Sequence, residues 1–256
     1  MDVCPLCNGT GFLLEDPCPL CTDEDGPERR SKQSVHLELP PATSGLDASA
    51  TPASTLCLVL DIDGTMLSES TPENCTAGEM RSFLRPHLDE FLDSVFESCG
   101  AVGIWTAASE AWLKMFLHAI DPSDKRPWAF RWSGKKVSYH RSGSIDQLYP
   151  TRYKVKKLSK IWNNNALRSL GYNRRSTLII DNTPRVCDCN YGNAIYVSTY
   201  GDDWMDGPAR DNADDCLLML MSYLKELSAH HAQGISMRVL EKRGWYAGTK
   251  SGFAPG

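Results

Sequence analysis

Residues 56–67 read Leu-Cys-Leu-Val-Leu-Asp-Ile-Asp-Gly-Thr-Met-Leu, and this stretch decides the fold. Its five leading apolar residues contain no turn former, which predicts a strand buried on both faces, as in a parallel sheet. Asp61 and Asp63 follow the strand, and Gly64 then turns the chain. In an open α/β sheet, ligands bind beyond the carboxyl ends of the strands, where both aspartates would lie. Two acids so close repel each other unless a cation lies between them or one is protonated, and both outcomes suit chemistry at a phosphate.

The composition is that of a soluble globular chain with one core domain and appendages. The 256 residues carry a net charge of −5, and 41% of them are hydrophobic. This acidic balance argues against binding nucleic acid through bulk charge. No apolar run approaches the ~20 residues of a membrane span, and the acidic, Cys-rich N-terminus is not that of a signal peptide. We therefore expect a cytoplasmic or nuclear protein without direct contact to nucleic acid or membrane.

Two C-x2-C motifs near the N-terminus predict a structural zinc site. Ten cysteines in a chain without a secretion signal point to metal binding or buried thiols instead of disulfides. Four thiolates from two such pairs complete a tetrahedral Zn²⁺ site, which leaves no coordination position for a substrate. A redox-active or unstructured Cys-rich tail is the alternative. Cys187 and Cys189 are expected to be loop thiols. The predicted zinc ligands are Cys4, Cys7, Cys18 and Cys21.

The composition divides the chain into four regions. Residues 1–25 form the zinc module, and residues 26–54 form a flexible linker rich in Pro, Ser and Thr. Residues 55–228 form the core domain, and residues 229–256 form a tail that either docks a partner or folds back on the core. The first Cys pair and the two glycines after it resemble one unit of the DnaJ-type cysteine-rich domain. The second pair lacks these glycines, so no chaperone activity is implied.

Further polar residues stand where predicted strands end. One apolar run ends at Thr106, whose hydroxyl either binds a ligand or caps the next helix, although Ser109 is the better cap candidate. Another strand, from residue 176, ends in Asp181 and Asn182. Carboxylate and amide oxygens are hard ligands, which suits Mg²⁺.

A cluster of lysines precedes a short predicted helix near residue 160. Lysine runs are usually solvated, so the residue types alone do not choose among Lys154, Lys156 and Lys157.

In their order along the chain, these motifs resemble those of the haloacid dehalogenase superfamily of phosphoryl-transfer enzymes. Asp-x-Asp-Gly-Thr resembles the first motif, the strand ending at Thr106 the second, and Asp-Asn-Thr-Pro from Asp181 the metal motif. Val-Lys-x-Leu resembles the lysine motif and singles out Lys156. Arg85-Pro86 begins a segment that resembles one branch, the phosphatases acting on the C-terminal domain of RNA polymerase II and their small relatives.

The resemblance implies a three-layer α/β core of Rossmann type, with a parallel sheet and a small β insert at about residues 121–150. In the related phosphatases this insert stands over the active site and helps to hold the substrate peptide. Phe130 and Arg131 lie about where those enzymes have a similar pair. Binding a substrate and packing the insert are both open for these two residues.

The resemblance also implies a role for each site residue. Asp61 would be the nucleophile that forms an aspartyl phosphate, and Asp63 would act as general acid and then base. Thr106 and Lys156 would bind the phosphate. The residues implied for the Mg²⁺ site are Asp61, Asp63 and Asn182, together with Asp181 as a ligand or as a neighbour of one.

The implied function is Mg²⁺-dependent hydrolysis of phosphoserine or phosphothreonine in proteins, with the C-terminal domain of RNA polymerase II as one candidate substrate. The phosphorylated protein is then the partner of the core, and a protein partner of the zinc module stays open. A small-molecule phosphatase would share every catalytic residue, although the short insert favours an open site. A non-catalytic scaffold with this fold could lose the paired aspartates, both of which are retained here.

Overall fold

The structure is a computed structural model that describes residues 12–13, 16–17, 55–142, 151–190, 192–201 and 214–246. The chain divides into two compact units, Met1–Ala50 and Thr51–Gly256. In the first unit, β1 (Phe12–Leu13) and β2 (Asp16–Pro17) form a short antiparallel pair. The predicted zinc ligands Cys4, Cys7, Cys18 and Cys21 and the linker at 26–54 lie outside the described residues.

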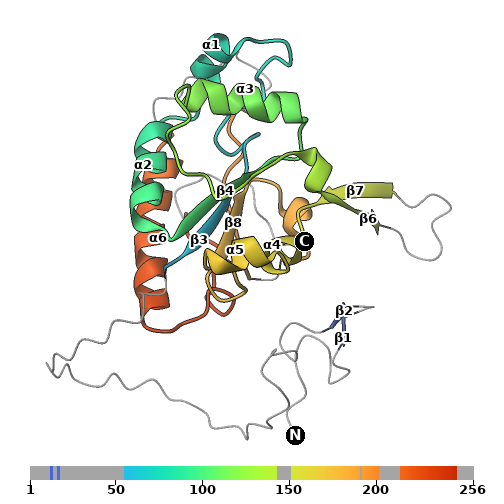
Figure 1. Cartoon of the computed structure of the whole chain (residues 1–256), viewed down its shortest axis with the longest axis vertical. Helices are drawn as coiled ribbons and strands as arrows, with labels where there is room; N and C mark the ends of the chain where they lie inside the picture. The colour runs from blue at the N-terminus through green and yellow to red at the C-terminus, as the bar shows by residue number, and fades with distance from the viewer. Residues whose placement is uncertain are drawn as a thin grey trace, which may run out of the picture. The chain divides into compact units, whose positions relative to one another are not determined.

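A five-stranded parallel sheet forms the centre of the second unit (Figure 1). The strand order is β5-β4-β3-β8-β9, so the strand of the opening motif, β3, lies in the middle and pairs with both β4 and β8. This confirms the predicted parallel α/β fold of Rossmann type. The strands are β3 (Cys57–Leu60), β4 (Ala101–Trp105), β5 (Arg131–Trp132), β8 (Thr177–Asp181) and β9 (Ala194–Tyr196).

Successive residues of the central strands pack on opposite faces of the sheet, which produces three layers. Leu58 and Leu60 belong to the core on the face covered by α2 (Leu88–Ser98), α3 (Glu110–Ile120) and α6 (Cys216–Ala232). Cys57 and Val59 belong to the core on the other face, covered by α4 (Ser159–Trp162) and α5 (Asn165–Ser169). Because both faces are covered, each central strand reads as a continuous apolar run. Shorter helical segments are α1 (Ala77–Met80), η1 (Arg81–Phe83), η2 (Gly134–Lys136) and η3 (Pro184–Cys187).

The predicted insert at residues 121–150 has different bounds in the structure. Residues 131–132 form β5, which extends the central sheet beside β4. Phe130 is buried under Gly103, where a Cβ atom would lie only 2.2 Å from the phenyl ring. Of the two alternatives for Phe130, the structure therefore supports packing. The insert proper is the antiparallel hairpin of β6 (Ser138–Ser142) and β7 (Thr151–Val155), which ends later than predicted.

The core also extends beyond the predicted boundary at residue 228. Helix α6 continues to Ala232, and Met237 beyond it is completely buried. Trp245 stacks on Tyr223 with ring centroids 5.5 Å apart and donates a hydrogen bond to the carbonyl of Tyr196 at 2.8 Å. Residues 229–246 therefore fold back on the core. Among the helices that the structure describes, none has the length and apolarity needed to cross a membrane.

Candidate active site

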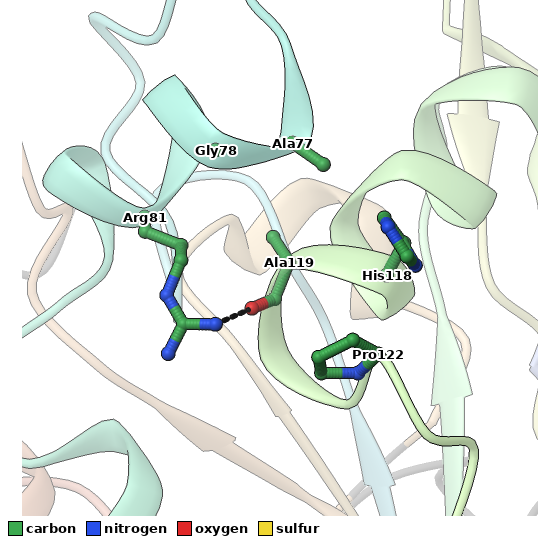
Figure 2. A pocket seen from close by; sticks show the side chains of 6 residues that line it. All are labelled: Ala77, Gly78, Arg81, His118, Ala119 and Pro122. Atoms are coloured by element: carbon green, nitrogen blue, oxygen red, sulfur yellow. Dashed lines mark hydrogen bonds between the residues drawn. The ribbon is translucent and has the colours of Figure 1, made fainter.

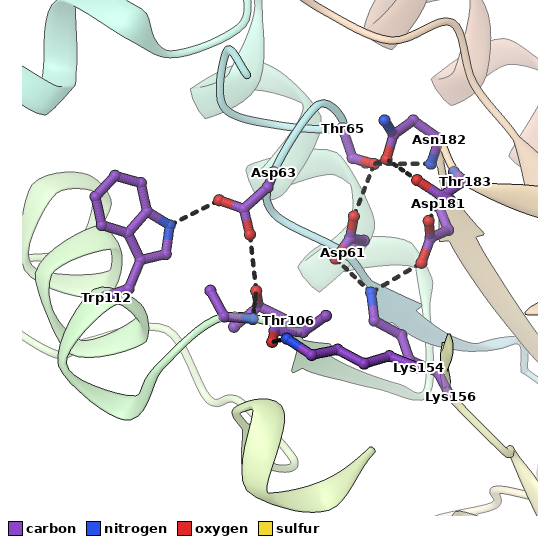
Figure 3. A network of polar contacts seen from close by, with 12 residues as sticks. Asp61, Asp63, Thr65, Thr106, Trp112, Lys154, Lys156, Asp181, Asn182 and Thr183 are labelled. Atoms are coloured by element: carbon purple, nitrogen blue, oxygen red, sulfur yellow. Dashed lines mark hydrogen bonds and ion pairs between the residues drawn. The ribbon is translucent and has the colours of Figure 1, made fainter. Parts of the chain in front are cut away.

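The carboxyl ends of neighbouring strands bring the predicted site residues together (Figure 3). Asp61 follows β3, Thr106 follows β4, and Asp181 is the last residue of β8. Lys156 follows β7 and reaches the same place from the hairpin. Since parallel strands end at one edge of the sheet, Asp61, Thr106 and Asp181 meet there, and Lys156 joins them from the hairpin.

A buried lysine joins two aspartates at the centre of the site. Lys156 Nζ forms an ion pair with Asp61 Oδ1 and a second with Asp181 Oδ2 at 2.8 Å. All three residues are almost fully buried, with exposed fractions of 1% for Lys156, 5% for Asp61 and 1% for Asp181. Lys154, by contrast, is exposed and donates to the carbonyl of Ala107 at 2.9 Å. Residue type alone did not choose among Lys154, Lys156 and Lys157; in the structure, Lys156 is the one paired with the aspartates of the site.

The site carries more negative than positive charge. Burial raises the pKa of Asp61 to about 8; Asp181 and Asp63 raise it as well, while Lys156 opposes the rise. Burial lowers the pKa of Lys156, but the two neighbouring carboxylates outweigh this effect and raise it above its ordinary value. The lysine therefore stays protonated. The remaining excess of negative charge is one that a divalent cation would offset.

Two hydrogen bonds turn the side chain of Asp63 away from Asp61. Thr106 Oγ1 donates to Asp63 Oδ2 at 2.8 Å, and Trp112 Nε1 donates to Asp63 Oδ1 at 2.7 Å. Figure 3 shows this carboxylate directed toward Trp112 and away from Lys156. The two aspartates of the opening motif thus lie in different surroundings, one fully buried beside a lysine and the other half-buried between two neutral donors.

Thr65 and Asn182 form another side of the site. Thr65 Oγ1 accepts from the Asn182 backbone N–H at 3.1 Å and lies 3.3 Å from Asp61 Oδ2. Asn182 Nδ2 donates to Glu69 Oε1 and to Thr199 Oγ1, both at 3.1 Å. With its nitrogen held in this way, the amide directs its oxygen toward Thr65, 3.4 Å away. Side-chain oxygen atoms of Asp61 and Asn182 therefore lie on the same side of the site, both next to Thr65 Oγ1.

Trp112 is a site residue that the sequence pattern did not identify. A Trp in the apolar stripe of a predicted helix is expected in the core, and Trp112 does pack partly against it. Ser109 caps α3 as predicted by accepting the Trp112 backbone N–H at 3.1 Å. The signal that could have identified Trp112 is its place in the first turn of a helix that begins just after a strand end. Such a residue lies at the ligand-binding edge of the sheet.

A separate hollow of about 160 Å³ lies between α1 and the end of α3 (Figure 2). Within it, Arg81 Nη1 donates to the carbonyl of Ala119 at 2.9 Å. None of its lining residues belongs to the carboxylate cluster at the strand ends. They are Ala77, Gly78, Arg81, His118, Ala119 and Pro122.

Two solved structures illustrate what the chain is similar to, and it spans just under two thirds of each. The first is that of Fcp1, an essential RNA polymerase II CTD phosphatase; identity is 19%, the TM-score is 0.46, and the match covers 71% of this chain and 64% of that one. The second is fission yeast Fcp1 with an Arg-to-Ala substitution, bound to beryllium fluoride; identity is 19%, the TM-score is 0.46, and coverage is 71% and 65%. Among curated proteins, none matches the chain.

A family model gives the wider match. The model of NLI interacting factor-like phosphatases matches residues 56–235. This range is more than half of the chain, and it includes all of the strand ends where the carboxylates, Thr106 and Lys156 meet. The chain therefore belongs to the family of NLI interacting factor-like phosphatases.

Proposed function

We propose that the core is a Mg²⁺-dependent phosphatase that hydrolyses phosphoserine or phosphothreonine in proteins through an aspartyl phosphate. The observation that carries the proposal is the unequal environment of the two motif aspartates. Asp61 is buried against the ammonium group of Lys156, whereas Asp63 is half-buried and hydrogen-bonded to Thr106 and Trp112. One carboxylate is thus placed beside a cation for attack, and the other is placed for proton exchange.

In the first chemical step, an Asp61 oxygen attacks phosphorus while the bond from phosphorus to the serine or threonine oxygen breaks. Asp63, protonated at this stage, donates its proton to the leaving oxygen. In the second step, water attacks the phosphorus of the aspartyl phosphate and gives a proton to Asp63, which releases inorganic phosphate and restores Asp61. Lys156 offsets charge on the phosphoryl oxygens, and charge stabilisation of this kind is the largest contribution in phosphoryl transfer.

The residues present fit Mg²⁺. The Thr65 hydroxyl has one proton to share between Asp61 Oδ2 and Asn182 Oδ1, so it does not occupy both of these hard oxygen atoms, whereas each side-chain oxygen of Asp63 accepts a hydrogen bond of its own. Asp61 and Asn182 would therefore hold the ion through their side chains, and Asp63 through its main-chain carbonyl. When bound, Mg²⁺ supplies positive charge beside the carboxylates and the phosphoryl oxygens.

Asp181 holds the lysine instead of the metal in this assignment. Its Oδ2 pairs with Lys156 at 2.8 Å, and its Oδ1 accepts from the Thr183 backbone N–H at 2.8 Å. Because both oxygens are engaged, Asp181 orients Lys156 toward Asp61.

The charge on the β6–β7 hairpin supports the proposal that the substrate is a protein. Arg141 and Arg152 are directly opposite each other on β6 and β7, and Tyr139 and Lys154 form the next pair on the same face. All four are exposed, and Lys154 contacts the carbonyl of Ala107 beside the active site. Like charges directly opposite each other destabilise a hairpin, whereas an acidic phosphopeptide lying on this face would offset them.

A panel of phosphopeptides and phosphorylated metabolites tests the proposal. Repeats of the RNA polymerase II C-terminal domain belong in the panel. We expect kcat/KM for the best phosphopeptide to exceed that for the metabolites by about 100-fold, since only a peptide reaches the hairpin. Replacing Arg141 and Arg152 with Ala should lower kcat/KM for peptides and leave an aryl phosphate unaffected.

The matched control is Arg168→Ala, which removes an exposed arginine on α5, outside the hairpin. Preference for the metabolites would favour a small-molecule phosphatase. Absence of turnover on every substrate, in a folded protein, would favour a scaffold.

Trp112→Phe is expected to lower kcat by roughly 10- to 100-fold and to leave KM for an aryl phosphate little changed. The substitution keeps an aromatic ring in the core but removes the N–H that holds Asp63, and a correctly placed acid–base group contributes about 10²–10⁴-fold. Trp162→Phe, which also removes an indole donor, is the matched control. An unchanged rate in Trp112→Phe would show that Trp112 only packs.

A further inference from the structure

A second group of metal-ligating side chains lies outside the active site. His140 on β6 and the consecutive residues Asp188 and Cys189 after η3 present ligand atoms that all lie within 4.8 Å of one another. Cys189 Sγ lies 3.6 Å from His140 Nε2. The sequence pattern predicted Cys189 as a loop thiol, and nothing in the proposed phosphatase chemistry uses these three residues.

The fold brings these residues together through β7. Tyr153 on β7 stands directly opposite His140 on β6, so both side chains lie on the hairpin face opposite the arginines. Just after β7, the backbone N–H of Lys156 donates to the carbonyl of Val186 in η3 at 2.8 Å. This bond fixes the end of the hairpin against the segment that carries Asp188.

Asp188 is oriented as a metal-binding carboxylate usually is. The Tyr153 hydroxyl donates to Asp188 Oδ2 at 2.6 Å, which leaves Oδ1 to bind an ion. The guanidinium of Arg185 lies 4.1 Å from the centroid of the Tyr153 ring and holds the phenol in place. Hydrogen bonds of this kind fix the direction of a ligand and commonly contribute 10- to 100-fold to metal affinity.

We propose that His140, Asp188 and Cys189 bind one Zn²⁺ ion. Imidazole nitrogen, thiolate sulfur and carboxylate oxygen are the three donors that Zn²⁺ accepts, and the sulfur disfavours Mg²⁺. Bond lengths of about 2.0–2.3 Å place the ligand atoms of a tetrahedral zinc about 3.3–3.8 Å apart. The distance of 3.6 Å between Cys189 Sγ and His140 Nε2 is within that range.

Three protein ligands leave the fourth position to water, so this zinc exchanges more readily than one in a closed Cys4 site. The ion fastens the hairpin to the segment after η3. The hairpin also carries the exposed arginines Arg141 and Arg152 and leads directly into Lys156. Zinc bound here would therefore hold the hairpin beside the active site without taking part in the reaction.

The test uses the full chain with Cys4, Cys7, Cys18 and Cys21 replaced by Ser, which removes the predicted N-terminal site. After equilibration with Zn²⁺ and removal of the excess, we expect about one zinc per chain and a higher Tm. With Co²⁺ in place of Zn²⁺, a sulfur-to-metal charge-transfer absorption should appear. Cys189→Ser should remove that absorption, and both Cys189→Ser and His140→Ala should lose the bound zinc.

Matched controls are Cys75→Ser and His118→Ala, at partly exposed or exposed positions in other parts of the fold, and both should keep the zinc. Tyr153→Phe is a milder variant that keeps the ring and every ligand, and its zinc affinity should fall by about tenfold. Zinc absent from the four-serine chain, or zinc binding unchanged in Cys189→Ser, His140→Ala and Tyr153→Phe, would overturn the proposal.

Discussion

Asp61→Asn is expected to lower kcat for an aryl phosphate by roughly 10⁴-fold or more, because removing a catalytic nucleophile has effects of this size. The amide that replaces the carboxylate is neutral and does not attack phosphorus. Lys156 keeps its second partner, Asp181, so the centre of the site stays paired. Steady-state hydrolysis at saturating Mg²⁺ measures the loss, and turnover near that of the native chain would refute the role of Asp61.

Thermal unfolding provides the control for this variant. The pKa of Asp61 is about 8 in the folded chain and its ordinary value is 3.8, so the folded state binds more protons than the unfolded state between these values. The stability that Asp61 contributes is therefore full below about pH 4 and is lost as the pH rises toward 8. Asn does not titrate. Without Mg²⁺, the variant should match or exceed the native chain in Tm at pH 8, and its advantage should shrink at pH 5.

Removal of Mg²⁺ is expected to abolish turnover, and added Mg²⁺ should restore it. The site combines buried carboxylates with a single lysine, and its ligands are hard oxygens that bind an exchangeable ion. A mild chelator should therefore remove Mg²⁺ while a closed thiolate site keeps its zinc. Activity that persists fully after chelation would contradict the metal assignment.

Asn182→Ala refines the same prediction. It deletes one proposed ligand and leaves the nucleophile in place, so the Mg²⁺ concentration for half-maximal rate should rise by about tenfold or more. The matched control is Asn74→Ala, at an exposed loop position. An unchanged Mg²⁺ dependence in Asn182→Ala would exclude this side chain as a ligand.

The central strands could be predicted from the sequence because burial on both faces leaves a continuous apolar run ended by a polar residue. β3, β4 and β8 all have this pattern. β5 does not, because a strand of two residues is too short to show a period. Its place in the sheet depends on the fit of Phe130 under Gly103, which is a tertiary contact.

The site residues likewise divide into those whose positions the sequence predicts and those that depend on tertiary contacts. Asp61, Thr106 and Asp181 stand at strand ends, so their convergence follows from the sheet, and the register of the lysine motif selects Lys156. The direction of the Asp63 carboxylate depends instead on a side chain from α3, the indole of Trp112. No short motif contains this pair.

The group formed by His140, Asp188 and Cys189 could not be predicted from the sequence either, since its members come from the hairpin and from the segment after η3. Neither segment carries a metal-binding spacing of its own. Only the packing of β7 against η3 brings them together.

The position of β3 in the middle of the sheet also matters while the chain is being made. β3 is the first strand of the sheet to be synthesised, yet its partner β8 begins only at Thr177. At about 5–20 residues per second, β8 follows roughly 6–23 s later. Throughout that interval the apolar run from Cys57 to Leu60 has an unpaired edge, which is the feature that promotes self-association of nascent chains. The strand at the centre of the completed fold thus waits longest for its second partner, and protection at the ribosome during this interval would limit self-association.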